Sequence, residues 1–417
     1  MPENKYTATS GPYASLQIKD FRLFILARTC VVVATQIQAT VVGWQVYEIT
    51  HDALSLGLIG MAEAIPAMTV SLYAGHVVDI IERKKILLIT VFVLLLCSSS
   101  LLFFTTSPGL FVFNYGAMPI YMIIFISGLS RGFLSPANFS FMPQLVPRHL
   151  YANAISLNST FWQASSIGGP MLAGFIYAFY GITASYLVDT MLVAAGLFFY
   201  FSLPKKNLPP VSEEQGILEK IKAGLSFVFK NEIVLSAITL DLFAVLFGGA
   251  VALLPIFARD ILNVGPQGLG LLRASPGIGA MIMALYLTHN PIQKNLGKIL
   301  LWSVAGFGFC MIGFGLSFNV WISLFILMIS GGFDSVSVIV RSTLIHTQTP
   351  ENMKGRVSAV NSIFVGSSNE IGMFESGVAA RLMGVVPSVI FGGCMTLLVV
   401  GITSRVSKSL RALQRVQ

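Results

Sequence analysis

Six acidic residues and four arginines lie inside long apolar segments of this 417-residue sequence, away from the ends of those segments. A charged group at bilayer depth costs at least about 2.5 kcal/mol on insertion scales, so each one marks a candidate binding or proton-transfer position. The chemistry open to them is ion pairing, polar ligand binding and proton uptake. The acids are Glu63, Asp189, Asp241, Asp334, Glu370 and Glu375, and the bases are Arg28, Arg131, Arg273 and Arg341.

The segments that hold these residues have the length and composition of membrane-spanning helices. Hydrophobic residues make up 55% of the chain and charged residues only 11%, about half the charge of a soluble domain. A bilayer core needs roughly 20 apolar residues per helix. We predict about twelve spans, at 22–48, 55–78, 86–106, 118–142, 152–177, 182–203, 232–258, 267–288, 299–318, 321–346, 357–381 and 385–404.

The basic residues are unevenly distributed between the two sides of the predicted membrane. Of the 26, twenty lie in loops on the side of both chain ends, four lie within spans, and only Arg259 and Arg381 lie on the opposite side. The positive-inside rule then places both termini in the cytoplasm. The net charge of +8 is explained by this topology, so no nucleic-acid partner is expected.

The longest polar break separates two groups of six predicted spans. We expect an N-terminal half at 1–203, a cytoplasmic linker at 204–231 and a C-terminal half at 232–417. The linker carries apolar residues at helical spacing, which predicts an amphipathic helix on the membrane surface. A shift of 203 residues aligns Gly128, Pro147, Asn158, Ser159, Phe161, Gly169 and Gly174 with Gly331, Pro350, Asn361, Ser362, Phe364, Gly372 and Gly377, which favours a duplication with a substrate path between the halves.

The loop after the second span resembles a signature of the major facilitator superfamily. It carries Gly75, Asp79 and Arg83 in the characteristic order, followed by two lysines. The resemblance implies a conformational latch that holds the halves together on the cytoplasmic face. The sequence departs from the common form by having Glu82 where glycine is frequent. An ordinary positive-inside loop is the simpler alternative.

A second stretch, from Pro136 to Gly174, resembles the fourth and fifth helices of the subgroup that contains the bacterial enterobactin exporter and macrolide efflux proteins. Gly169, Pro170 and Gly174 look like its antiporter motif, in which small residues permit close helix packing. The implied fold is all-α, with about twelve transmembrane helices in two six-helix pseudo-repeat halves.

The family also places helices 1, 4, 7 and 10 around a central cavity. This implies that Arg131, Asp241 and Asp334 are the strongest cavity residues. Asp334 lies seven residues before Arg341 on the same helix face, so the two could instead form a structural ion pair. The further candidates for substrate binding or proton coupling are Gln36 on the polar stripe of the first span, together with Glu63, Glu370 and Glu375.

These patterns predict a secondary transporter of the bacterial inner membrane. The leading expectation is a proton-coupled, monomeric exporter of siderophore-like or amphipathic drug-like small molecules. The alternatives are an uptake permease for a polar metabolite and, less favoured, a non-transporting receptor or lipid scramblase. No nucleotide-binding loop or metal-ligand spacing of the cysteines occurs, so we expect no cofactor, no metal and no enzymatic activity.

Overall fold

The computed structural model describes residues 11–413, except 107–114, 207–216, Gly249, Gln293 and 351–352. Within these residues the chain forms helices and no strands. Because a bilayer offers no partner for backbone groups, helices satisfy each N–H and C=O within the segment itself. The N-terminal helices are η1 (Ala14–Gln17), α1 (Lys19–Thr50), α2 (Ala53–Ile80), α3 (Arg83–Thr106), α5 (Met118–Phe141), η2 (Met142–Gln144), η3 (Arg148–Leu150) and α6 (Tyr151–Phe201).

The C-terminal helices follow a single connecting helix, α7 (Ile217–Lys230). The first of them, α8, ends where Gly248 packs against the ring of Phe307. Short 3-10, α and π turns then lead into α10. The elements are α8 (Glu232–Gly248), η4 (Ala250–Leu253), α9 (Leu254–Ile256), η5 (Phe257–Ile261), α10 (Gly265–His289), α11 (Leu296–Gly315), α12 (Val320–Gln348), α13 (Lys354–Met383), α14 (Val385–Val406) and α15 (Lys408–Ala412).

Ten helical segments of the described chain are long and apolar enough to cross a membrane. The sequence predicts about twelve spans, and the difference has two causes. The spans at 152–177 and 182–203 are both contained in α6, where Gly181 has a φ of 81° and a ψ of 179° and breaks the helical path. The predicted span at 357–381 forms α13, whose composition is more polar than that of the other long helices.

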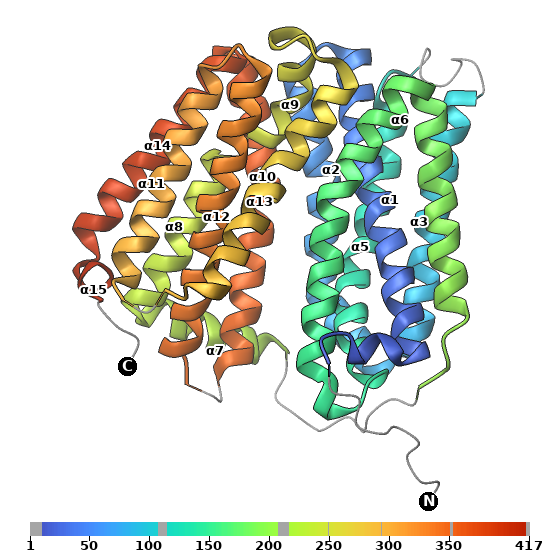
Figure 1. Ribbon diagram of the computed structural model, residues 1–417, viewed down its shortest axis with the longest axis horizontal. Coiled ribbons are helices and arrows are strands. Elements are labelled where there is room, and N and C mark those ends of the chain that lie inside the picture. Colours follow the sequence, from blue (N-terminus) through green and yellow to red (C-terminus); the bar gives the residue numbers. More distant parts are fainter. Residues whose placement is uncertain are drawn as a thin grey trace, which may run out of the picture.

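The helices form two groups that meet at one end of the molecule (Figure 1). The ribbons of α1–α6 and of α8–α14 converge around α9 and lie apart at the opposite end, where η1, α7 and α15 are found. Both the first and the last described elements therefore lie at the same end. A hydrophobic core cluster joins the groups, since it contains Trp44 and Leu56 as well as Phe257 and Phe314.

Three glycine pairs of the 203-residue repeat occupy equivalent helix contacts. A Cβ at Gly128 would lie 2.5 Å from the Glu63 carbonyl oxygen of α2, and Gly331 abuts Pro276 of α10 in the same way. Gly169 packs on α1, and Gly372 packs on α8. The third pair, Gly174 and Gly377, lies where the two groups of helices touch. Such close approaches require glycine, because any larger residue would separate the backbones.

The connecting helix α7 packs on protein. Leu225 and Val228 of its apolar face join a core cluster with Ile345 and Val360, and a Cβ at Gly224 would lie 2.7 Å from the Arg356 carbonyl oxygen. The amphipathic pattern of the sequence predicts a helix on the cytoplasmic membrane surface, and in the structure the apolar face of these residues is buried against protein. The amphipathic pattern is the same in both cases, since either surface buries one apolar face.

Candidate functional site

A group of four ionisable residues lies where the two groups of helices meet; we call it the junction cluster. Glu63 of α2 and Arg131 of α5 form an ion pair. Gly128, one turn before Arg131, lets α5 approach the α2 backbone at Glu63 itself. The packing of these two helices thus sets the position of the pair.

The other members of the junction cluster come from the second group of helices. Glu370 of α13 lies within electrostatic range of Glu63 and Arg131, and Arg273 of α10 lies within range of Glu63. The Oε2 atom of Glu370 and one terminal guanidinium nitrogen of Arg273 are buried and have no hydrogen-bond partner in the described chain. Two acids and two bases from four helices therefore lie near one another, with Glu63 within electrostatic range of the other three.

A second ion pair lies wholly within the C-terminal group. Arg341 of α12 pairs with Asp241 of α8, and each side chain is only 6% exposed. The sequence spacing suggests Asp334 as the partner of Arg341, but the structure gives Arg341 a partner on another helix. The sealed position of this pair is typical of a structural ion pair, and neither group is open to a ligand in this conformation.

Asp334 has different surroundings from Asp241. Its side chain is exposed and makes no hydrogen bond or ion pair within the described residues. Phe325, which is 57% exposed, lies nine residues earlier on α12, about 180° around the helix at 100° per residue. The two side chains therefore lie on opposite faces of α12.

Two contacts between glycines hold the two groups of helices close together where they meet. A Cβ at Gly174 of α6 would lie 2.9 Å from the Cα of Gly270 on α10, and one at Gly377 of α13 would lie 2.9 Å from the Cα of Gly57 on α2. Gly60, one turn further along α2, faces Met373 and the Glu370 carbonyl oxygen. The junction cluster therefore adjoins the second crossing directly.

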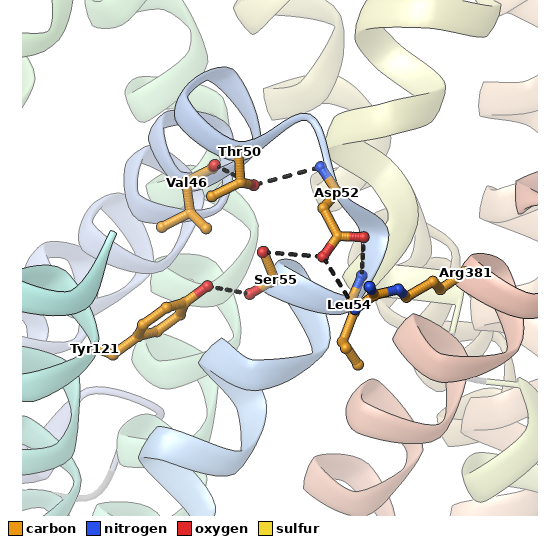
Figure 2. Close-up of polar contacts among 7 residues, drawn as sticks. All are labelled: Val46, Thr50, Asp52, Leu54, Ser55, Tyr121 and Arg381. Atoms are coloured by element: carbon orange, nitrogen blue, oxygen red, sulfur yellow. Dashed lines mark hydrogen bonds and ion pairs between the residues drawn. The ribbon is translucent and has the colours of Figure 1, made fainter. Parts of the chain in front are cut away.

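Polar contacts reinforce the same end of the molecule. Asp52 accepts hydrogen bonds from the Leu54 amide and the Ser55 hydroxyl as the N-cap of α2, and it also pairs with Arg381 of α13 at 3.9 Å (Figure 2). The Tyr47 hydroxyl donates a hydrogen bond to Asp260. These contacts link α1 and α2 to the C-terminal helices.

Arg259 belongs to the same set of contacts, because its guanidinium lies 5.9 Å from the centre of the Tyr47 ring. Arg259 and Arg381 are the two basic residues that the sequence leaves on the side opposite the termini, and both contact the N-terminal group. These contacts are absent from the functional sites predicted from sequence. Their isolation on that side is the signal that could have identified them.

The remaining predicted residues take different positions. Gln36 of α1 is half-buried, and a Cβ at Gly169 would lie 2.5 Å from its Cβ. Glu375 is also half-buried but lies about 140° around α13 from Glu370 at 100° per residue, so the two acids face different surroundings. The carbonyl oxygen of Pro170 faces Gly270 and would lie 2.6 Å from a Cβ added at that glycine.

Within the described residues, Gly75 and Arg83 make no contact with the opposite group of helices. Arg83 donates a hydrogen bond of 3.1 Å to the Ser140 carbonyl at the end of α5, and Gly75 has open space beside it. The Asp79 side chain lies outside the described residues. No group of three His, Cys, Asp or Glu side chains that could hold a metal occurs in the described chain.

Comparison with known proteins identifies the family. The MFS_3 family, described as transmembrane secretion effectors, matches residues 10–415. This chain belongs to the major facilitator superfamily. Its curated relatives include the enterobactin exporter EntS of Salmonella typhimurium, 26% identical over 92% of this chain and 90% of the relative. EntS of Shigella dysenteriae is 28% identical over the same shares.

Solved structures agree with this facilitator fold. A bacterial homologue of the iron transporter ferroportin, in an inward-facing state, aligns with a TM-score of 0.70 at 16% identity, over 95% of this chain and 99% of the other. A POT family transporter bound to 5-aminolevulinic acid aligns with a TM-score of 0.72 at 12% identity, over 94% and 96%. The chain is thus a multi-pass membrane transporter of small molecules, and the family and relatives it matches are transporters, not enzymes.

Proposed function

We propose that this protein is a proton-coupled exporter of siderophore-like or amphipathic drug-like molecules that works by alternating access. The observation that carries the proposal is the junction cluster, in which acids and bases from both groups of helices face one another. The direction of transport and the cargo class are supported by the similarity to enterobactin exporters.

The moving parts in this proposal are the halves 1–203 and 232–417, joined by the linker 204–231. Rocking of the halves around a central site is the general mechanism of transporters built from parallel repeats. The contacts Asp52–Arg381 and Tyr47–Asp260 would break when the site opens on the side opposite the termini. The excess of basic residues in the loops on the side of the termini favours a cytoplasmic position for both termini, and with them for the end where the two groups of helices lie apart.

Glu370 is the residue that we assign to proton coupling. With all four members ionised the junction cluster is neutral, and a proton on Glu370 gives it a net positive charge. That change alters the electrostatic energy between the halves, because Glu370 and its neighbours Glu63 and Arg131 belong to different halves. Protonation thereby becomes linked to the joining and separation of the halves.

The substrate would bind on the walls that these helices share. Asp334, exposed and unpaired within the described residues, and Gln36 are the polar residues that we assign to the cavity wall. The protein is proposed to act as a monomer, since one chain supplies both halves.

Transport by purified protein in lipid vesicles tests this function. Where the protein is inserted with its cytoplasmic side outward, an acidic lumen should drive accumulation of enterobactin, and a protonophore should abolish it. Accumulation driven only by an alkaline lumen would indicate co-transport with protons and overturn the exporter assignment. Accumulation that ignores the gradient would overturn proton coupling.

A further inference from the structure

An apolar groove of about 540 Å³ runs between α3 and the final turns of α6. Its walls include Leu88, Phe92 and Leu95 from α3 and Ala194, Leu197 and Phe201 from α6. Phe92 and Phe201 are exposed, and in a membrane protein such side chains face lipid. The groove therefore matches a hydrocarbon chain in its chemistry.

One end of the groove is fixed by a buried lysine. The Lys84 ammonium donates hydrogen bonds to the carbonyl oxygens of Phe201 and Leu203. Carbonyl groups at the end of a helix such as α6 have no partner within the helix itself. The ammonium also lies 5.7 Å from the centre of the Phe201 ring. This contact holds the first turn of α3 beside the last turn of α6 and brings positive charge to the end of the groove.

Lys85 lies at the N-terminal end of the apolar wall that α3 contributes to the groove. It precedes Leu88 and Ile89 by three and four residues and Phe92 by seven, so it lies on the same stripe of α3, one turn nearer the membrane surface. Its side chain is 63% exposed, and its ammonium lies 3.7 Å from a carboxylate oxygen of Glu82. An exposed pair of this kind is weak, so the Lys85 ammonium is available to another anion.

Lys205 adds a second exposed cation at this place. It follows Leu203, whose carbonyl Lys84 binds, by two residues. The adjacent Lys206 already pairs with Asp20 of α1 at 3.4 Å. Two accessible ammonium groups thus flank the end of a groove lined by hydrocarbon.

We propose that this groove is a binding site for one anionic phospholipid. An acyl chain lies between α3 and α6, and the phosphate lies at the membrane surface against Lys85 and Lys205. Basic residues beside a groove between membrane helices favour anionic head groups. A zwitterionic phospholipid has the same phosphate and acyl chains but brings its own ammonium near the two lysines, so it binds more weakly.

Native mass spectrometry of the purified full-length protein tests the site with phosphatidylglycerol and phosphatidylethanolamine as probes. We expect phosphatidylglycerol to be retained in preference, and Lys85→Gln to weaken its binding about fivefold, the effect of losing one lysine at a lipid head group. The double change Lys85→Gln/Lys205→Gln should remove the preference. Binding of phosphatidylethanolamine should change little in either variant.

Two further variants separate the groove from general surface charge. Lys298→Gln removes an exposed lysine at the third residue of α11, the position that Lys85 holds in α3, and should leave phosphatidylglycerol retention unchanged. Ala194→Trp fills the groove and should reduce retention of both lipids. Equal loss in Lys85→Gln and Lys298→Gln would overturn the site, as would retention unaffected by Ala194→Trp, or occupation of this face by a second copy of the chain.

Discussion

The two ion pairs inside the helical bundle differ in what surrounds them. Asp241 and Arg341 neutralise each other within one half and are each 6% exposed. Glu63 and Arg131 also belong to one half, but they are 18% and 38% exposed and face Glu370 and Arg273 of the other half. In the proposed transport cycle, the Asp241–Arg341 pair moves as a unit with one half, whereas the electrostatic energy of the junction cluster changes when the halves separate. The buried charges of Asp241 and Arg341 therefore serve the fold, whereas those of the junction cluster serve, as we propose, the transport cycle.

The largest expected effect comes from breaking the sealed pair. Arg341→Met leaves the Asp241 carboxylate buried without a partner, which destabilises a protein by about 3 to 5 kcal/mol. Thermal unfolding in detergent should show a strongly lowered Tm. The double variant Asp241→Leu/Arg341→Met should recover most of that stability and still transport. A double variant as unstable as the single one would contradict the structural role.

A smaller effect is expected from separating the halves at a glycine crossing. Gly174→Val places side-chain atoms against Gly270, and overpacking of this kind costs about 1 to 3 kcal/mol. The conformation in which α6 and α10 touch at this crossing, the joined state, should become less populated. A cysteine introduced near Asp260 should then be labelled faster from the side opposite the termini. Gly168→Val, on the same helix with open space beside it, is the control. Equal labelling in the two variants would exclude a role for the crossing.

Neutralising the junction cluster should affect coupling more than folding. Glu370→Gln removes the proposed proton site, and we expect gradient-driven transport to fall by at least about tenfold, equivalent to about 1.4 kcal/mol, while counterflow of cargo and the Tm are largely kept. Glu375→Gln, on the same helix but on another face, is the matched control. Full activity of Glu370→Gln together with loss of coupling in Asp334→Asn would move the proton site to α12.

The smallest effect should come from the exposed pair at the end where the two groups of helices meet. Arg381 and Asp52 are 59% and 35% exposed, and such pairs contribute about 0.2 to 1 kcal/mol. Arg381→Gln should therefore shift the balance between the joined and separated states only severalfold, as measured by distances between spin labels on the halves. Asp52→Asn should match it, because asparagine also caps a helix. Asp52→Ala should cost about 1 kcal/mol more through loss of the cap.

The sequence by itself determined the features that depend on local composition. Apolar run lengths predicted the long helices, and the loop charges separated Arg259 and Arg381 from the other basic residues. The 203-residue repeat identified Gly128, Gly169 and Gly174 as equivalents of later glycines, and each pair proves to occupy a close contact. These features are local or periodic along the chain, so no knowledge of packing is needed to find them.

Only the tertiary structure decided which residues meet. Helical spacing can relate Arg341 to Asp334 on its own helix, but the pairing with Asp241 depends on how α8 and α12 cross. The same holds for Glu370, whose neighbours Glu63 and Arg131 lie about 240 or more residues earlier in the chain. An amphipathic pattern likewise required α7 to bury an apolar face without choosing between lipid and protein. Helix periodicity fixes the direction of a side chain on its own helix, whereas its partner depends on the packing of faces that are distant in sequence.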